Sequence, residues 1–279
     1  MINVVTPSSL RERNTRIIQR RYMDTLWNLR IAKQLVAGDF KIRFRQTLLG
    51  LGWFVLPIIL TFGISFASTG GSGNRYTSTG GDIFMRTLVG VTLWQLFTTT
   101  CTEPLRLVRR NRGMLLSFSS SGNIFLLAGA MSSILSFLFQ SIPLFVIVFT
   151  SGREAAPVIY GLLLGAPAIV LAGAALACLM LPASLGMLDV RYGVPYLNWS
   201  LLFATPIFYE VHNSGIVGFV NRWNPMWHIV RPTIDLIDGK GLAPRNLAVG
   251  YLLAITFICT AEIYLRIKFR KAMVTMVPR

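Results

Sequence analysis

Residues 38–58, GDFKIRFRQTLLGLGWFVLPI, change from basic to apolar at their middle. Basic residues lie in the first half, and no charge follows between Leu48 and Arg75. Such a change is typical of a chain that enters a bilayer from its positively charged side. The apolar run 48–68 has about the 20 residues that a helix needs to cross a hydrocarbon core. The stretch therefore predicts the first of several membrane spans, with the preceding residues on one side of the membrane.

The composition is typical of a membrane protein. Hydrophobic residues make up 53% of the 279 and charged residues only 14%, whereas a soluble domain has roughly 25% charged residues. We therefore expect one all-α integral membrane bundle and not two soluble domains. The net charge of +16 would also suit a nucleic-acid partner. However, the basic residues flank the apolar runs as the positive-inside rule requires, so we expect no nucleic acid.

Further apolar runs predict a transmembrane domain over 48–279 with six transmembrane helices. Gly161 and Gly165 lie in one of these runs at GxxxG spacing, which lets helix backbones approach closely. We expect this spacing to serve helix packing. The six expected spans are 48–68, 83–100, 124–150, 157–183, 194–209 and 248–265.

Residues 1–47 are expected to lie in the cytoplasm, as a basic tail followed by an amphipathic helix over 22–37. Apolar residues recur every fourth position from Trp27 onward, opposite a polar side. Such a helix suits the membrane interface, and Gly38 is expected to end it. Packing on a soluble partner is the alternative for this helix.

Residues 210–247 lie between the fifth and sixth spans and contain apolar patches that Gly, Pro or charge interrupts. These patches are too short to cross a bilayer and predict re-entrant helices. Asn224–Pro225 and Arg231–Pro232 are expected to be turns or helix starts.

The basic residues predict the orientation of the chain. An even number of spans puts both termini on the same side. Most of the 27 lysines and arginines fall on that side in this layout. We therefore expect both termini in the cytoplasm and residues 210–247 at the outer face.

The sequence offers little catalytic or ion-coupling chemistry. The 11 acidic residues are scattered, with none in the middle of an expected span, which disfavours ion-coupled transport. The sequence has no P-loop, so we do not expect this chain to hydrolyse a nucleotide. Asp235 and Asp238 could suggest a metal or sugar-transfer site, but no third ligand stands nearby in the sequence. A passive or externally powered conduit fits these observations best.

Several short motifs lie in order along the chain, near the ends of the expected spans. They are residues 39–47 (DFKIRFRQT) followed by Trp53 and Pro57, 108–111 (VRRN), 188–191 (LDVR), and 205–209 (TPIFY) followed by Asn224–Pro225. With these motifs the chain resembles the membrane (permease) subunits of type-2 ABC exporters, in the branch that exports O-antigen, teichoic acid and capsule polysaccharide. The resemblance covers residues 26–271. The chain departs from the family in its long basic N-terminal extension and its short polar segment after the fourth span.

The resemblance implies a homodimer of this chain with two copies of an ATP-binding cassette subunit, which would hold ATP and magnesium. It implies that this chain is a transport subunit, not an enzyme, and binds no cofactor itself. The implied substrate is a lipid-linked polysaccharide, and the implied location is the bacterial plasma (inner) membrane. A type-2 exporter of a drug or lipid is the first alternative, and a membrane-bound glycosyl-transferring enzyme is the second.

Coupling to the ATP-binding subunit is expected at the basic loop 106–112 and at the helix 22–37. The same arginines could instead serve only to hold the loop in the cytoplasm. The expected coupling residues are Trp27, Arg30, Arg106, Arg109, Arg110, Arg112, Asp189 and Arg191.

A path for a polysaccharide is expected to have aromatic rungs. The apolar face of a sugar ring stacks on aromatic side chains, which have few rotors and lose little entropy when they become ordered. An interfacial belt or core packing is the alternative role for these residues. The expected path residues are Trp53, Phe54, Tyr196, Trp199, Phe203 and Tyr209.

Overall fold

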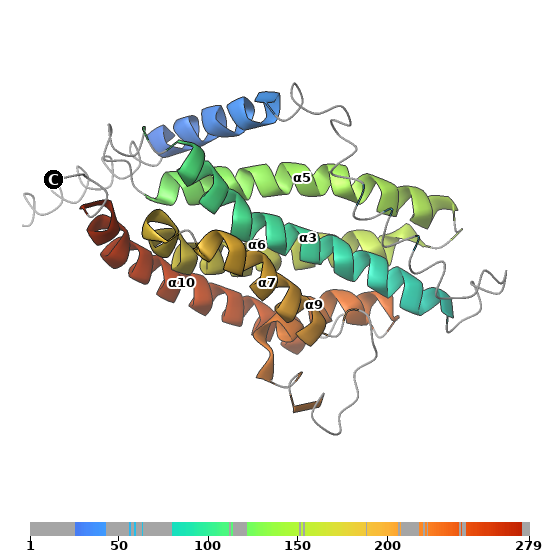
Figure 1. Ribbon diagram of the computed structural model, residues 1–279. Helices are drawn as coiled ribbons and strands as arrows, with labels where there is room; N and C mark the ends of the chain where they lie inside the picture. Colours follow the sequence, from blue (N-terminus) through green and yellow to red (C-terminus); the bar gives the residue numbers. More distant parts are fainter. Residues whose placement is uncertain are drawn as a thin grey trace, which may run out of the picture.

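The computed structural model of the chain is all-helical wherever it describes regular structure (Figure 1). The described residues are 26–42, 56, 59, 63, 80–111, 113, 122–150, 152, 154–187, 189–205, 207, 218–219, 221, 223–239, 241 and 244–274. An N-terminal helix covers residues 26–42. The labelled helices are α3 (Gly80–Arg110), α5 (Gly122–Thr150), α6 (Ala155–Gly186), α7 (Asp189–Ala204), α9 (Pro225–Ile237) and α10 (Pro244–Val274).

Three of the described helices are long and apolar enough to cross a membrane: α5, α6, and residues Pro244–Phe269 of α10. They correspond to the third, fourth and sixth expected spans and support a transmembrane protein. The second expected span falls within α3, and the fifth overlaps α7, which has only 16 residues. The first expected span, 48–68, lies outside the described residues except for single positions.

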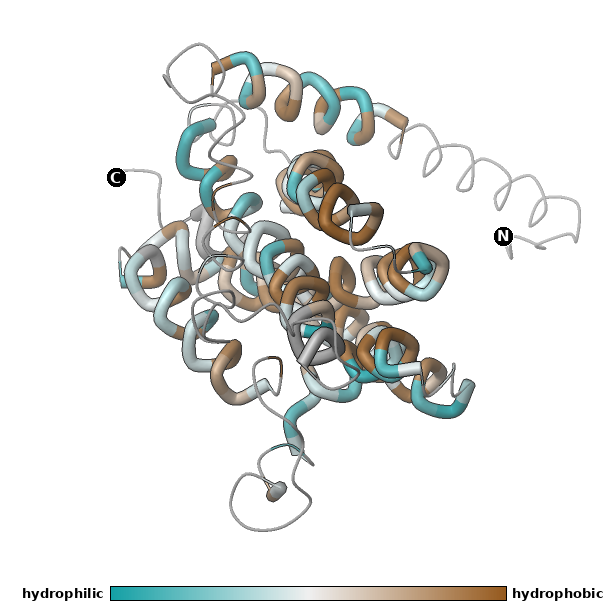
Figure 2. Tube along the Cα trace, turned by 90° about the vertical axis from the view of Figure 1, so that its right-hand side faces the viewer, coloured by the Kyte–Doolittle hydropathy of each residue, from teal (hydrophilic) through white to brown (hydrophobic). Residues whose placement is uncertain are grey.

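The helix α6 lies at the centre of the bundle and packs against α3, α9 and α10 (Figure 1). One buried hydrophobic cluster joins these helices with α5 and includes Phe97, Ile169 and Trp227. A second cluster extends to the N-terminal helix through Ala32 and Val36. Seen from the end of the bundle, the N-terminal helix lies across its outside (Figure 2).

The glycines of the GxxxG motif in α6 are the point at which α9 approaches most closely. A β-carbon on Gly161 or Gly165 would collide with the side chain of Thr233 in α9. The Thr233 hydroxyl donates a hydrogen bond of 3.0 Å to the Gly161 carbonyl. The GxxxG spacing therefore serves helix packing, as expected, and the partner is a short helix of the same chain.

A further glycine of α6 lets this helix pack closely against α3. A β-carbon on Gly173 would lie 2.9 Å from Cβ of Thr100 and 3.0 Å from the carbonyl oxygen of Phe97. In turn, Gly129 of α5 leaves room for the ring of Pro104 in α3. Both helices therefore approach α3 through a glycine, and α3 has little freedom to shift between them.

The helix α9 begins where the sequence indicated. The Asn224 side chain caps it by accepting a hydrogen bond of 3.0 Å from the Met226 amide. The Asn224 amide nitrogen also donates to the carbonyl of Ala204 and to the hydroxyl of Thr205, at 3.0 Å each. Asn224 thus joins the end of α7 to the start of α9.

The expectation of a turn or helix start at Arg231–Pro232 is wrong, because Pro232 lies inside α9. Proline lacks the amide that would bond to the carbonyl four residues earlier, which is that of His228. This carbonyl faces α10, where a β-carbon on Gly250 would come within 2.8 Å of its oxygen. Gly250 therefore lets α10 pack closely against α9 at the turn where the hydrogen-bond ladder of α9 is broken.

Two helix ends also differ from the expectation. The N-terminal helix continues through Gly38 to residue 42, because the next turn carries Asp39, which pairs with α3. The helix α3 continues to Arg110. Arg106, Arg109 and Arg110 therefore lie on its last turns and not in a loop.

We predict that Gly165→Ala lowers the stability of the protein by about 1–3 kcal/mol, the usual cost of overpacking a core. The added methyl group would meet the Thr233 hydroxyl. Thermal unfolding in detergent measures the effect. Gly193→Ala is the control, because nothing lies within 4 Å of a β-carbon at that position of α7. Equal stability of both variants would contradict the close α6–α9 packing.

Candidate functional site

Four charged residues connect the N-terminal helix to the last turns of α3: Asp39, Glu103, Arg106 and Arg110, here called the Asp39 network. Arg106 Nη2 lies 2.5 Å from both Asp39 Oδ2 and Glu103 Oε2. Arg110 Nη1 lies 2.9 Å from Asp39 Oδ1. Each oxygen of the Asp39 carboxylate therefore has its own guanidinium donor.

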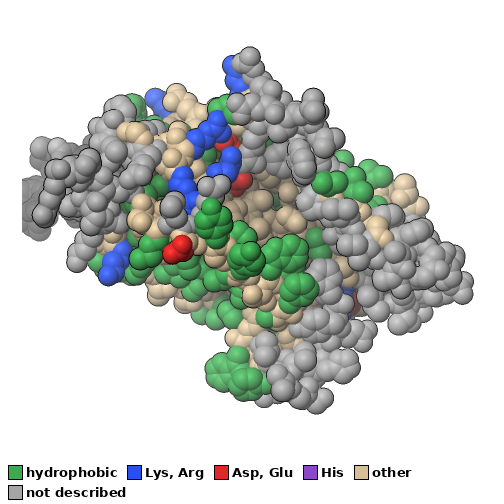
Figure 3. Space-filling model, viewed as in Figure 1, with side chains coloured by type: hydrophobic (Ala, Val, Ile, Leu, Met, Phe, Trp, Pro, Cys, Tyr) green, Lys and Arg blue, Asp and Glu red, His purple; other side chains and the backbone are tan. Residues whose placement is uncertain are grey.

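Helical spacing on both sides produces this arrangement. Glu103, Arg106 and Arg110 are three and four residues apart, so they share one face of α3. Asp39 follows Ala32 and Val36 on the buried face of the N-terminal helix. Side chains of Lys and Arg gather over this end of the molecule, with acidic atoms visible beneath them (Figure 3).

Asp39 is the most buried member of the pairs that it forms with Arg106 and Arg110. The Asp39 side chain is only 2% exposed, whereas those of Arg106 and Arg110 are 40% and 37% exposed. Burial by itself lowers the pKa of Arg106, but the hydrogen bonds and charges of Asp39 and Glu103 outweigh it and raise that pKa above its ordinary value. The guanidinium therefore stays charged and compensates the carboxylate that has been removed from water.

The structure brings together only part of the expected coupling set. Arg106 and Arg110 belong to the Asp39 network, and Arg109 is half-buried on the same turns of α3. Trp27 and Arg30 are exposed on the outer side of the N-terminal helix, away from its buried face. Arg112 and the side chain of Arg191 lie outside the described part of the chain, and Asp189 is exposed at the start of α7.

Sequence reasoning missed Asp39 and Glu103 as partners of the arginines. The signal for Glu103 was its spacing of three residues before Arg106, a distance at which helical side chains meet. For Asp39 the signal was an acidic residue on the apolar side of an amphipathic helix, where it needs a cation. The choice of partner depends on tertiary packing.

Aromatic side chains form a continuous exposed row along α7, here called the α7 aromatic face: Tyr192, Tyr196, Trp199 and Phe203. Their steps of four, three and four residues keep them on one side of the helix, and each is more than half exposed. The rings of Trp199 and Phe203 stack with centroids 6.1 Å apart and an interplanar angle of 26°. Hydrophobic side chains gather over α7 in Figure 3.

The α7 aromatic face contains three of the expected path residues and adds Tyr192, which the same helical spacing could have identified. The opposite side of α7 is buried through Val194 and Leu202. The aromatic side therefore does not form the intrachain core of α7. Trp53, Phe54 and Tyr209 lie outside the described residues.

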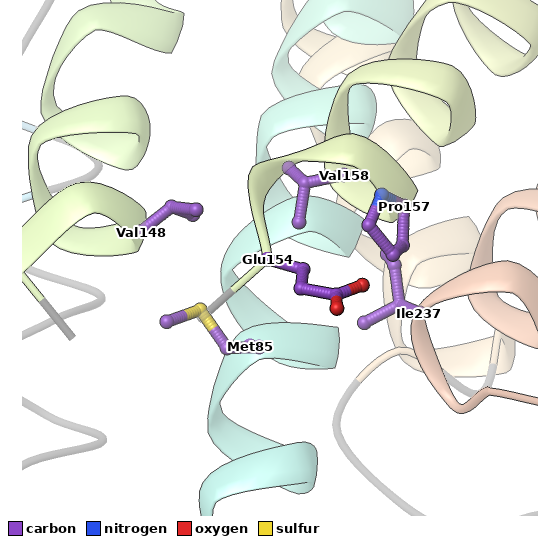
Figure 4. A pocket seen from close by; sticks show the side chains of 6 residues that line it. All are labelled: Met85, Val148, Glu154, Pro157, Val158 and Ile237. Carbon is purple, nitrogen blue, oxygen red and sulfur yellow. The ribbon is translucent and has the colours of Figure 1, made fainter. Parts of the chain in front are cut away.

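A cavity of about 180 Å³ opens between the ends of α3, α5, α6 and α9 (Figure 4). The Glu154 carboxylate points into it beside Pro157 and Ile237. Next to this cavity Arg86 is buried and lies 3.8 Å from Asp238, the residue after α9. The other described residues that line the cavity are apolar: Met85, Val148, Pro157, Val158 and Ile237.

The described residues contain no group of three or more His, Cys, Asp or Glu side chains that could hold a metal ion. Asp235 pairs with Arg231 at 3.4 Å and accepts a hydrogen bond from Asn246. Asp238 faces a different cation, Arg86. The two acids that could have suggested a sugar-transfer site therefore have separate partners.

The chain matches no family model, and comparison with the curated proteins gives no match. The observations that bear on function are therefore the spans, the Asp39 network and the α7 aromatic face.

We predict that Asp39→Asn loosens the N-terminal helix, because the neutral amide removes the counter-charge of Arg110 and leaves Arg106 paired with Glu103 of its own helix alone. Loss of charged hydrogen bonds costs about 2 kcal/mol, so amide exchange of residues 26–42 should become roughly thirty-fold faster in hydrogen-exchange mass spectrometry. The control is Glu262→Gln, which removes an exposed ion pair with Arg266. Exposed pairs contribute little. Unchanged exchange in Asp39→Asn would show that the network does not hold the helix.

Proposed function

We propose that the chain is the permease subunit of an ATP-driven exporter that moves a lipid-linked polysaccharide across the bacterial plasma membrane. The α7 aromatic face carries this proposal. An exposed row of rings on a membrane-associated helix supplies stacking surface without fixed charge, and a long sugar polymer could slide along such a surface.

Two further observations support a transport role. Three described helices are long and apolar enough to span a membrane, which supports a position of the chain in a bilayer. The Asp39 network then offers a firm connection between an N-terminal helix with an exposed basic side and the bundle. In the proposed assembly, two ATP-binding cassette subunits dock near this end and hold ATP and magnesium, and a second copy of this chain completes the conduit.

The full proposed topology has six spans, re-entrant helices within residues 210–247 and cytoplasmic termini. The helix α9 fits a re-entrant role. It has 13 residues, or about 20 Å at 1.5 Å per residue, and is too short to cross a bilayer of about 30 Å. It also packs against both α6 and α10.

An exporter of a drug or lipid is the alternative within the same class, because aromatic rings would bind such molecules as well. Depletion of this chain in its native cells separates the two. We expect lipid-linked polysaccharide to accumulate on the cytoplasmic side, still attached to its carrier. Normal surface polysaccharide after depletion would contradict the proposal, as would sugar-transferase activity of the purified chain alone.

The aromatic face has its own test. We predict that Trp199→Ala and Tyr196→Ala each lower the export rate about five-fold, because one aromatic contact is worth about 1 kcal/mol. Surface polysaccharide in complemented cells measures this at matched membrane levels of the chain. Tyr160→Ala is the control, since Tyr160 is 60% exposed on α6, away from α7's aromatic row. Equal export by all three variants would assign the α7 rings to packing or to the interfacial belt.

A further inference from the structure

A second hollow lies on the outside of the bundle, between α6, the start of α9 and α10. Its volume is about 230 Å³, and it is here called the α6–α10 groove. Ala172 forms its floor on α6, and Met226 and Ile229 line it from α9. Leu253 and Phe257 line it from α10.

The length of α9 explains why the groove exists. The helix α9 packs against both α6 and α10, which also contact each other directly, as in the 2.7 Å hydrogen bond from the Tyr251 hydroxyl to the Leu164 carbonyl. The two long helices continue past the point where α9 begins at Pro225, which also borders the groove. The groove therefore lies beside the contact between α6 and α10, at the point where α9 no longer covers it.

The groove lies at mid-height of these spans. Ala172 is near the middle of α6 (Ala155–Gly186), and Thr256 is near the middle of the apolar stretch Pro244–Phe269. Within that stretch of α10 only 17% of an 18-residue apolar window is buried inside the bundle. At this depth a bilayer contains hydrocarbon and almost no water, so hydrocarbon is the medium that meets the groove.

The lining is apolar even where threonines contribute. The Thr256 hydroxyl bonds to the carbonyls of Leu252 and Leu253 at 2.9 and 3.0 Å. The Thr260 hydroxyl bonds in the same way to Thr256 and Phe257. Both hydroxyls are thus engaged by their own helix, and the described lining residues offer a water molecule too few polar partners to hold it here.

We propose that the α6–α10 groove binds one acyl chain of a membrane phospholipid. An apolar cavity of about 150 Å³ is large enough for benzene, so 230 Å³ accommodates a segment of a hydrocarbon chain. Bound there, the acyl chain fills the space beyond the start of α9 and supports the cap at Asn224. This inference does not depend on the exported substrate.

The affinity should be modest. Lipid tails are as apolar as the groove, so no hydrophobic transfer energy favours binding. Binding is favoured only by the closer van der Waals packing of the acyl chain against the groove walls. We therefore expect local enrichment of a few-fold over the bulk bilayer, which covalent capture can detect.

The test uses the full chain in bilayer nanodiscs with a small fraction of phospholipid that carries a diazirine at the middle of one acyl chain. After irradiation and digestion, we expect lipid adducts to concentrate on residues 225–229 and 253–260. Thr256→Trp should fill the groove and lower adduct formation at Met226 and Ile229 at least three-fold. Ile255→Trp, at an exposed position on another face of α10, should leave these adducts unchanged.

Adducts spread evenly over the exposed residues of α10, and insensitive to Thr256→Trp, would overturn the proposal. A second copy of the chain could occupy the groove instead. Lipid adducts at the groove in nanodiscs that hold one copy, and their loss in nanodiscs that hold two, would also overturn the proposal. Should Thr256→Trp fail to fold, Thr260→Phe fills the other end of the groove, and the adduct map of the unmodified chain still decides.

Discussion

The position of the N-terminal helix depends on one buried charge. The Asp39 side chain is only 2% exposed. A carboxylate this buried stays ionised at low cost only if cations replace the water that it has lost. Arg106 and Arg110 supply them from the last turns of α3. The N-terminal helix must therefore lie where α3 ends, and the outward side of the same helix is left free for other contacts.

From this end, close contacts continue through the bundle. Glycines fit α3 against α5 and α6, and two more fit α6 against α9. Asn224 then joins the start of α9 to the end of α7, which carries the aromatic face. Packed helices of this kind move as bodies and do not deform continuously. In the proposed exporter, a displacement imposed at the N-terminal helix would reach α7 through these contacts.

Features set by local sequence could be predicted, and features set by distant contacts could not. Apolar length indicated α5, α6 and α10, glycine spacing indicated close packing of α6, and Asn224–Pro225 indicated a helix start. The continuation of a helix through Gly38 and the burial of Asp39 depend on residues 67 and 71 positions away, which periodicity does not reveal. Pro232 lies inside α9 and not at a helix start, and the close approach of α10 to this turn is likewise a distant contact that the local sequence does not show.

The central claim is that the N-terminal helix and α3 behave as one body that carries force into the bundle. The test measures the electron–electron distance between spin labels at Lys33 and Asn111 in nanodiscs. Labelled chain is diluted into unlabelled chain, so that only distances within one copy are observed. The account predicts one narrow distance distribution that is the same for the chain alone and for its complex with the proposed ATP-binding subunit, with and without ATP. A distribution that broadens or shifts when ATP binds, while Asp39 is intact, would contradict it.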